Sequence, residues 1–480
     1  MSAHRLSVSQ FIARPIDEVF AFFTRPANLG RITPAAKGFE LLTDDGDLRD
    51  GLEISWRIRP LLGIPMTWTA TIAGFRPGRG FVDVQIRGPY RSWEHHHTFE
   101  AVDGGTIVRD EIQYTLPFGP LGDLVNRLVV RAELRRLFGY RREAIRTIFT
   151  APGEPSGMTV AVAGGTGFVG GGIAIELHRR GHAVRVLSHR GEAARGGLPD
   201  AVDVRRADVQ TGDGLVDALR GADALAIALA FQNSPIEAPG KHQTFMEVDA
   251  AGTERLIAAA REAGVRRVVY LSGAGAAPDA KRHWFRAKWR AEEAVRGSGL
   301  TWTIIRPTWI FGPRDVSLNR FLGFARRLFM VPLTNTGSQL LAPVFIDDAA
   351  ALAADSLVTD AAAGQVFELG GPATLKMREI IATALRVAGL RRPIVPGPTP
   401  LIKLLAVTLA WLPTPILTPD AVDFINQPAT VDLAPLLERM PRRLTSLEEG
   451  LATYLGPESA DAALVFDGPA TGPGSAPDRG

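Results

Sequence analysis

Polar and apolar positions alternate along most of the first 116 residues, and a period of two is typical of half-buried strands. Strands are predicted over 5–12, 52–59, 66–75, 81–87, 92–101 and 106–116. Pro15 begins a short helix, and apolar residues at helical spacing predict one long helix over 121–149. This order predicts an antiparallel sheet that curls against the long helix and leaves a cavity between them.

From Met158 onwards the pattern changes to strands and helices in alternation. The predicted strands are 158–164, 183–190, 222–230, 265–273 and 301–311, and the helices between them include 167–181 and 251–264. Strand–helix–strand units of this kind build a parallel, doubly wound sheet with helices on both faces.

Proline, glycine and small polar residues cluster at 151–157, between the two patterns, and predict a linker. The first domain is therefore expected at 1–150 and the second at 158–455. Glycine, proline and small residues dominate the remaining stretch, 456–480. Because such a stretch buries little apolar surface, we expect it to be a disordered tail.

The composition excludes several classes of site. The 480 residues include no cysteine, which excludes disulfides, thiolate zinc sites, iron–sulfur clusters and cysteine nucleophiles. The net charge is +3 and the basic residues are scattered, so no nucleic-acid partner is expected.

The sequence predicts no signal peptide and no run of ~18 apolar residues, so we expect a cytoplasmic protein without a spanning helix. The nearest approach to such a run is 401–412, which contains Lys403 and stops at Pro413. A buried or amphipathic helix is one interpretation. The other is a membrane-surface patch that places the protein at the inner face of a membrane, and both stay open.

The strongest motif is a glycine triad with the pattern GxxGxxG between a predicted strand and a predicted helix. Glycine permits a tight turn and lets backbone N–H groups approach a pyrophosphate, and the helix N-terminus adds its positive dipole end. A second strand about twenty residues on completes the context that a dinucleotide site needs. The expected cofactor contacts in this motif are Gly164, Thr166, Gly167, Phe168, Val169 and Gly170.

The second strand of this region ends in the sequence LSHR, where a NAD-preferring site normally carries an acid. Ser188 stands near that position, and Arg190 can pair with a 2′-phosphate through two parallel hydrogen bonds. We therefore expect NADP or NADPH rather than NAD, with His189 as a second contact, although a solvated surface arginine is the alternative. Asp208 and Val209 fit the place where such folds contact adenine, unless Asp208 is a plain loop acid.

These motifs resemble a known family. Residues 158–455 are similar to extended, atypical short-chain dehydrogenases/reductases in GGTGFVG, GTERLIAAAREAGVRRVVYLSGAG, AEEAVRGSGLTWTIIRPTWIFGP and VFIDDAA. The sequences PLIKLLAVTLAWLP, ILTPDAVDFI and SLEEGLATYLG resemble the branch related to the NADPH-binding accessory subunit of respiratory complex I. The resemblance implies a Rossmann fold, a nicotinamide cofactor and oxidoreductase chemistry.

The family's chemistry uses a tyrosine and a lysine four residues apart, with a serine or threonine nearby. Lys288 matches the lysine, but the residue four positions before it is Trp284, whose indole N–H donates and does not titrate as a phenol does. The resemblance implies Lys288 and Ser272 as catalytic residues, with Lys288 also a ribose contact. His283 is either a substitute acid or a packed side chain, and Tyr270 is expected in the core.

Two further sets of residues match the family. Arg306, Pro307 and Thr308 match the strand end that flanks nicotinamide, so Pro307 is an expected cofactor contact. Asp347 and Asp348 match a turn before a helix, where a capping role is expected. The missing tyrosine puts ordinary carbonyl reduction in doubt, whereas cofactor binding is expected to survive.

Residues 4–150 resemble the START-like superfamily, also called SRPBCC-type, which includes polyketide cyclases and dehydrases. The resemblance rests on ARPIDEVFAFFTRPANLGRITP, GPYRSWEHHHTFE, GTIVRDEIQYTLPFG and RLFGYRREAI, and it implies an α+β helix-grip fold around an apolar cavity. The expected cavity residues are Trp56, Trp68, Trp93, His95 and His97. Such a lining suits a lipid, quinone, isoprenoid or polyketide-like ligand, and a core packed shut is the alternative.

Three consecutive histidines stand on one predicted strand. Alternation places His95 and His97 on one face and His96 on the other. Two histidines at this spacing ligate a metal only if a further ligand joins them, and Asp110 or Glu111 on the next strand would be the candidate. Polar cavity lining and a structural pair are the alternatives, and we expect no metal.

Three functions fit these observations. The first is an NADP-dependent oxidoreductase or isomerase that acts on a hydrophobic small molecule held by the first domain. The second is an NADPH-binding protein with a structural or sensing role and no turnover, which Trp284 favours. The third is a lipid or quinone carrier whose function resides in the first domain. The retained Lys288 and the complete glycine motif are compatible with either of the first two functions, and the first is our prediction.

Overall fold

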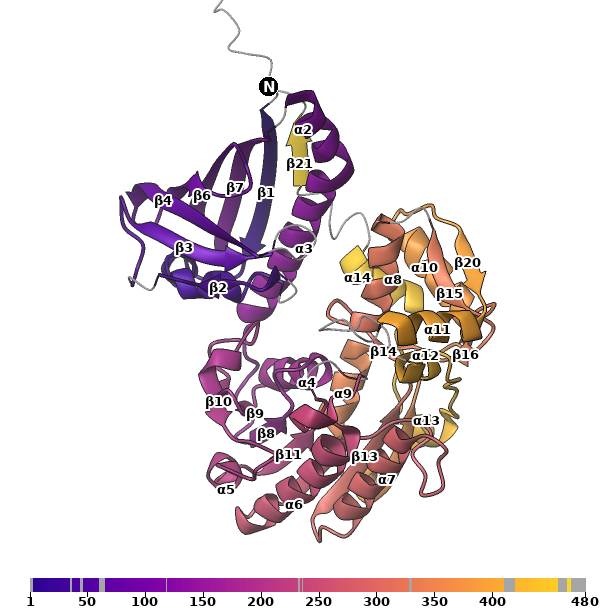
Figure 1. Ribbon diagram of the computed structural model, residues 1–480. Helices are drawn as coiled ribbons and strands as arrows, with labels where there is room; N and C mark the ends of the chain where they lie inside the picture. Colours follow the sequence, from indigo (N-terminus) through magenta and orange to yellow (C-terminus); the bar gives the residue numbers. More distant parts are fainter. Residues whose placement is uncertain are drawn as a thin grey trace, which may run out of the picture. The chain divides into compact units, whose positions relative to one another are not determined.

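The computed structural model describes residues 3–34, 37–43, 46–59, 65–117, 119–231, 234, 236–327, 330–409, 419–455 and 464–467. The chain divides into two compact units, which we describe separately (Figure 1). Unit 1 comprises Met1–Phe149 with Pro457–Gly480, and unit 2 comprises Thr150–Gly456. The division falls between Phe149 and Thr150, beside the proline- and glycine-rich stretch 151–157.

Unit 1 is a large antiparallel sheet in the strand order β2-β3-β4-β5-β6-β7-β1-β21. Its elements up to residue 149 are β1 (His4–Ile12), α1 (Ile16–Phe23), η1 (Pro26–Gly30), β2 (Glu40–Leu41), β3 (Glu53–Ile58), β4 (Met66–Arg76), β5 (Gly80–Arg87), β6 (Ser92–Val102), β7 (Gly105–Thr115), α2 (Gly119–Val125), η3 (Asn126–Val130) and α3 (Arg131–Ile148). The predicted long helix is thus α2, a π-helical turn and α3 in sequence.

The helices α1 and α3 cover one face of this sheet (Figure 1). Phe22 of α1 and Ile145 of α3 share a core with Ile54 and Ile72 of the sheet. Alternation along the strands decides which side chains reach that core, because every second residue of a strand points to the same face. The expected α+β helix-grip fold is confirmed, and the alternating pattern is the reason that it could be predicted.

The C-terminal stretch contributes one strand to unit 1. β21 (Leu464–Asp467) pairs antiparallel with β1, with Leu6 opposite Phe466 and Val8 opposite Leu464. The expectation of disorder is therefore wrong for these four residues, while the rest of 456–480 lies outside the described residues. The apolar run Leu-Val-Phe has high strand propensity and covers the edge of β1 that would otherwise leave backbone groups unpaired.

Unit 2 contains a seven-stranded, fully parallel sheet in the order β10-β9-β8-β11-β12-β13-β18, which confirms the doubly wound Rossmann fold. Its first elements are β8 (Thr159–Ala163), α4 (Phe168–Arg179), β9 (Ala183–Ser188), η4 (Gly191–Ala194), β10 (Asp203–Arg206), α5 (Leu215–Leu219), β11 (Ala224–Ile227), η5 (Pro239–Lys241), η6 (Phe245–Ala251), α6 (Gly252–Glu262), β12 (Arg267–Leu271), α7 (His283–Arg296) and β13 (Thr301–Pro307). α4 and α9 pack on one face of the sheet, and α5, α6 and α7 pack on the other.

The later part of unit 2 adds a third cluster of buried side chains around α8, α10 and α14. The remaining elements are β14 (Ile310–Phe311), α8 (Val316–Arg327), β15 (Val331–Thr334), β16 (Leu340–Leu341), β17 (Val344–Phe345), α9 (Ile346–Ser356), η7 (Asp360–Ala362), β18 (Gln365–Leu369), β19 (Leu375–Lys376), α10 (Met377–Val387), β20 (Ile394–Gly397), α11 (Thr399–Leu409), α12 (Pro419–Ile425), α13 (Ala434–Arg439) and α14 (Leu447–Leu455).

The apolar stretch 401–412 falls largely on α11, and its last three residues lie outside the described residues. Lys403 forms an ion pair with Asp423 of α12 at 2.5 Å, while Leu404 and Val407 are more than half exposed. Among the helices that the structure describes, none is long and apolar enough to cross a membrane. Contact of α11 with a membrane surface stays a prediction.

Candidate functional site

The glycine turn of unit 2 connects β8 to α4, and backbone atoms fill the space around two of its glycines. Gly164 has a φ of +80°, and a Cβ at this position would lie 2.2 Å from the carbonyl oxygen of Ala228. A Cβ on Gly170 would lie 2.3 Å from the carbonyl oxygen of Gly164. Gly167 is the N-cap of α4, so the free N–H groups of the first helical turn follow it directly. The turn fits a pyrophosphate, whose negative charge the helix N-terminus attracts.

Thr166, Phe168 and Val169 lie within the same turn and first helical residues. Phe168 and Val169 are half-buried and pack against the core beside α9, so their backbone, rather than their side chains, is available to a cofactor. Their placement agrees with a role in shaping the turn.

The end of β9 presents an arginine near the turn. Arg190 follows β9 at the start of η4, its side chain is exposed, and it forms no side-chain hydrogen bond or ion pair with any described residue. Ser188 is buried, and its hydroxyl accepts a hydrogen bond from the backbone N–H of Arg190. His189 is exposed beside it. The guanidinium of Arg190 is therefore available to an anionic group.

Asp208 has a structural role in the turn after β10. Its carboxylate accepts a hydrogen bond from the backbone N–H of Gln210 at 2.8 Å, and its carbonyl oxygen accepts one from Gly212. Val209 packs against the core beside Gly252. These contacts fix the loop that was expected near adenine. Whether Asp208 and Val209 contact adenine stays a prediction.

Lys288 is held by its own chain. Its Nζ lies 2.6 Å from Oδ1 of Asp249, which is 1 % exposed, and it donates a hydrogen bond to the carbonyl oxygen of Leu271 at 3.3 Å. The ammonium also lies 5.4 Å from the centroid of the Tyr270 ring. Burial opposes the charge of Lys288, but the carboxylate of Asp249 outweighs it and raises the pKa of the lysine.

Among the described residues, the phenol near Lys288 is that of Tyr270, which is buried and not exposed to a substrate. Trp284 is 4 % exposed and lies among aromatic rings, including that of Phe424 at 5.5 Å. Tyr270 is completely buried in the core, as expected, and burial raises the pKa of its hydroxyl. His283 lies 3.0 Å from a carboxylate oxygen of Glu237, which favours a structural role over that of a substitute acid.

Ser272 belongs to a buried charged network. Its hydroxyl donates a hydrogen bond to Glu292 at 2.6 Å, and Glu292 is fully buried. Arg306 donates two hydrogen bonds to the same carboxylate at 2.8 and 2.7 Å, and Arg296 donates one at 2.6 Å. The structure thus ties Ser272 to Glu292, and Lys288 to Asp249 and to the carbonyl of Leu271, the residue before Ser272. Their catalytic roles stay a prediction. Neither partner carboxylate had a signal in the sequence.

Two further family matches concern Pro307 and Asp348. Pro307 ends β13, at the edge of the sheet where the glycine turn also lies, and its contact with the cofactor stays a prediction. Asp348 does not cap α9; it accepts hydrogen bonds from the backbone N–H and hydroxyl of Thr445 at 2.7 and 3.1 Å. The expected capping role is therefore wrong for Asp348, because a distant loop supplies the donors.

Unit 1 contains a cavity of about 230 Å³ between the sheet and its helices, so the cup is not packed shut. The five residues expected there, Trp56, Trp68, Trp93, His95 and His97, all line it. Trp56 and Trp68 stack with ring centroids 5.8 Å apart, and Trp93 meets Trp68 edge-on at 5.2 Å. The wall is therefore mostly aromatic and apolar.

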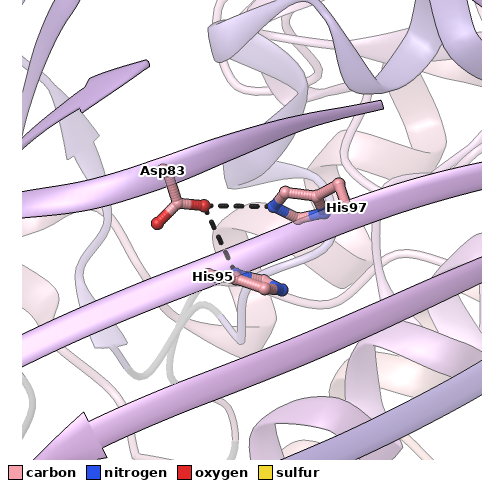
Figure 2. Close-up of side chains that lie close together, drawn as sticks. All are labelled: Asp83, His95 and His97. Atoms are coloured by element: carbon pink, nitrogen blue, oxygen red, sulfur yellow. Dashed lines mark hydrogen bonds and ion pairs between the residues drawn. The ribbon is translucent and has the colours of Figure 1, made fainter. Parts of the chain in front are cut away.

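Part of the cavity lining is polar. The side chains of Asp83, His95 and His97 belong to this lining and converge from neighbouring strands (Figure 2). Asp83 Oδ2 lies 3.3 Å from His95 and 3.1 Å from His97, and Asp110 Oδ1 lies 3.1 and 2.7 Å from the same two rings. Each imidazole therefore bridges two carboxylates in a closed ring of four side chains. Strand register explains the arrangement, because Asp83 pairs with His95 across β5–β6 and Asp110 with His97 across β6–β7.

The charges in this cluster stabilise one another. Burial opposes the charge of His97, but Asp110 and Asp83 outweigh it and raise the pKa of the imidazole to about 9. The same contacts hold the pKa values of both aspartates well below their ordinary range, against the effect of burial. His97 is therefore an imidazolium and both aspartates are carboxylates at neutral pH.

Arg141 on α3 also lines the cavity, and it had not been expected there. It stands in an apolar stripe of the helix with Leu134, Phe138, Ile145 and Ile148, and an arginine in such a stripe is the signal that could have revealed it. Burial lowers the pKa of Arg141, and the charges of Asp110 and Asp83 act in the opposite direction.

The ligand atoms of Asp83, His95 and His97 lie within 4.8 Å of one another, which would allow a metal ion. Each nitrogen of the two imidazoles already faces a carboxylate, so these contacts hold the cluster together without an ion. Our expectation that the cluster binds no metal stays a prediction.

Comparisons with known proteins agree with both units. A family model described as "Polyketide cyclase / dehydrase and lipid transport" matches residues 12–138, and one described as "NAD(P)H-binding" matches residues 164–318. The 40 kDa subunit of NADH-ubiquinone oxidoreductase from Neurospora crassa is 28% identical over 62% of this chain and 81% of its own length. (4-Alkanoyl-5-oxo-2,5-dihydrofuran-3-yl)methyl phosphate reductase from Streptomyces griseus is 32% identical over 48% of this chain and 74% of its own length.

The similarity to solved structures concerns unit 2 and shows only its fold. UDP-glucuronic acid 4-epimerase from Bacillus cereus matches with a TM-score of 0.50 and 17% identity, over 62% of this chain and 98% of that one. Together with the glycine turn, the family matches identify unit 2 as an NAD(P)-binding, oxidoreductase-like domain with a nicotinamide cofactor.

Proposed function

We propose, because this chain belongs to the short-chain dehydrogenase/reductase family, that it binds NADP(H) in unit 2 and a hydrophobic small molecule in the cavity of unit 1. The observation that carries the proposal is the glycine turn, where backbone oxygens occupy the space that side chains at Gly164 and Gly170 would need. The backbone of this turn would hold the pyrophosphate, and the dinucleotide, when bound, supplies a hydride.

Arg190 supports NADP(H) over NAD(H). A NAD site normally holds the ribose hydroxyls with an acid at the end of the second strand, and this chain has the buried Ser188 there. The exposed guanidinium of Arg190 has no partner among the described side chains and is suited to a phosphate on the same ribose. Charge at this strand end therefore favours the phosphorylated cofactor.

A second candidate is a protein that holds NADP(H) without turnover. It is favoured by the ion pair between Lys288 and Asp249, together with a buried indole at the position of the family's tyrosine. A carboxylate at 2.6 Å keeps the lysine charged and directed at its own chain, and Trp284 cannot exchange a proton with a substrate.

The test uses the full chain in two steps. Calorimetric titration with NADPH and with NADH is expected to give about tenfold tighter binding of NADPH. The absorbance of NADPH is then followed in the presence of decanal or 1,4-naphthoquinone as hydrophobic acceptors. Consumption of NADPH supports an oxidoreductase, and binding without consumption favours the second candidate. Failure to bind either dinucleotide contradicts both.

A further inference from the structure

The cavity of unit 1 contains a buried cation that the proposed function does not use. Arg141 is 7% exposed and lines the cavity. Its guanidinium carbon lies 4.9 Å from the centroid of the Phe138 ring, and its Nε is buried without a hydrogen-bond acceptor. Its side chain forms no hydrogen bond or ion pair with the residues that the structure describes.

The nearby carboxylates do not accept hydrogen bonds from Arg141. Asp83 and Asp110 interact electrostatically with Arg141, but their printed contacts, at 2.7 to 3.3 Å, are with His95 and His97. A guanidinium N–H group that is removed from water without an acceptor is costly in free energy, and Nε of Arg141 is in that state. An acceptor that enters with a ligand would recover that cost, because hydrogen bonds from a charged donor to a carboxylate are among the strongest.

We propose that the cavity binds a hydrophobic carboxylic acid, with its carboxylate on the guanidinium of Arg141 and its apolar body beside Trp56 and Trp68. The inference rests on the proposed function, which places a hydrophobic small molecule in the same cavity. The planar guanidinium matches the two oxygens of a carboxylate with two parallel hydrogen bonds. The stacked indoles offer the apolar surface that the rest of the ligand needs.

The charges of the other cations in the cavity lining indicate whether the ligand carries a carboxylate or a phosphate. Lys37 forms an ion pair with Glu133, and Arg25 lies 3.9 Å from Asp47 and is largely exposed. Among the described residues of the lining, Arg141 is thus the arginine or lysine that has no carboxylate in contact with it. One available positive charge in an apolar cavity suits a monoanion, whereas a phosphate monoester near neutral pH carries up to two negative charges.

The experiment compares decanoate, 1-decanol and decyl phosphate, which share one alkyl chain, as ligands of the full-length protein. Binding is measured by calorimetry and by quenching of tryptophan fluorescence, to which the indoles of the lining respond. The wild-type protein is expected to bind decanoate about tenfold more tightly than decanol, and more tightly than decyl phosphate. In Arg141→Met, decanoate and decanol are expected to bind equally, with the affinity for decanol preserved.

Two further variants control the experiment. Arg146→Met removes an exposed arginine of the same helix and is expected to keep the preference for decanoate. Arg141→Lys retains the charge without the planar fork and is expected to lose part of the preference. If Arg141→Met fails to fold, the inference is tested by comparing the preference for decanoate over decanol in the wild-type protein with that in Arg141→Lys.

Three outcomes overturn the inference. Equal affinities of the wild-type protein for decanoate and decanol overturn it and leave the hydrophobic cavity of the proposed function in place. A preference that survives in Arg141→Met overturns the role of this residue. Failure of the wild-type protein to bind any of the three probes overturns the inference together with the ligand part of the proposed function, while NADPH binding is unaffected.

Discussion

Asp249 and Lys288 form an ion pair of 2.6 Å between η6 and α7, at the lysine that the short-chain dehydrogenase/reductase family directs at its cofactor. The carboxylate is almost completely buried, and the ammonium also donates to the backbone of Leu271. The lysine is thus fixed from two sides by its own chain, which makes Asp249 the residue that decides what Lys288 can do.

Asp249→Asn is expected to lower the free energy of unfolding by about 3 kcal/mol, because it leaves Lys288 as a buried charge without a counter-ion. Urea denaturation near neutral pH measures the change. Glu254→Gln is the control, since it breaks an exposed ion pair with Arg290 and is expected to cost less than about 1 kcal/mol. Equal losses in the two variants would show that the buried pair contributes no more than a surface one.

Gly170→Ala is expected to abolish NADPH binding, because its Cβ would lie 2.3 Å from the carbonyl oxygen of Gly164 and the turn would have to open. Gly197→Ala is the matched control, since no atom lies within 4 Å of a Cβ at that position. Calorimetric titration of both variants with NADPH measures the effect. Unchanged binding by Gly170→Ala would exclude the turn as the pyrophosphate site.

Arg190→Glu is expected to weaken NADPH binding by about tenfold or more and to leave NADH binding nearly unchanged, because a carboxylate repels a 2′-phosphate and accepts from ribose hydroxyls. Arg220→Glu changes the same charge at another exposed position of unit 2 and serves as the control. Competition between NADPH and NADH on each variant gives the ratio of their affinities. Equal losses of NADPH affinity in both variants would mean that only overall charge matters.

The stability of unit 1 is expected to depend on the charge of His97. Its pKa is 6.5 in the unfolded chain and about 9 in the folded one, so its protonation contributes about 3 kcal/mol to folding. Because the folded pKa is raised, this contribution is fully present below about pH 6.5 and is lost as the pH rises through about 9. His97→Gln should therefore destabilise most at about pH 6, and less at about pH 9.5.

Urea denaturation of wild type and His97→Gln at the two pH values measures this difference. His96→Gln is the control, because its side chain lies on the opposite face of β6 and is 37% exposed. A stability difference for His97→Gln that does not change with pH would mean that the imidazolium is not held by Asp83 and Asp110.

Arg141→Met is expected to raise the free energy of unfolding of the ligand-free protein by about 1 kcal/mol, because an apolar side chain of similar length replaces a buried guanidinium without acceptors. Thermal denaturation, with and without decanoate, measures it. If Arg141 binds the ligand, the variant should be more stable than the wild type without ligand. It should also gain less stability than the wild type when decanoate is added. A lower stability without ligand would indicate that Arg141 is structural.

Much of the fold could be predicted because it depends on local patterns. Alternation in unit 1 and the strand–helix order of unit 2 are repeated over many residues, and each repeat strengthens the same interpretation. The expected face of His95 and His97 followed from the same period of two. The strand at 464–467 could not be predicted in this way, because its partner β1 is more than 450 residues away in the chain.

The partners of the site residues were the part that the sequence did not reveal. Lys288 and Ser272 were found by their spacing, but Asp249 and Glu292 meet them through tertiary packing, which no local period encodes. Asp83 depends in the same way on the register between β5 and β6, which only the folded sheet defines. Spacing along the chain thus located the residues, and packing decided their roles.

The pairing of β21 with β1 has a consequence for synthesis on the ribosome. The first strand of unit 1 emerges before unit 2, and its partner at Leu464–Asp467 emerges only after all of unit 2 has been made. Throughout that interval β1 is an open edge, able to pair with another nascent chain. The order of translation therefore makes the closing of the first sheet wait until unit 2 has been synthesised.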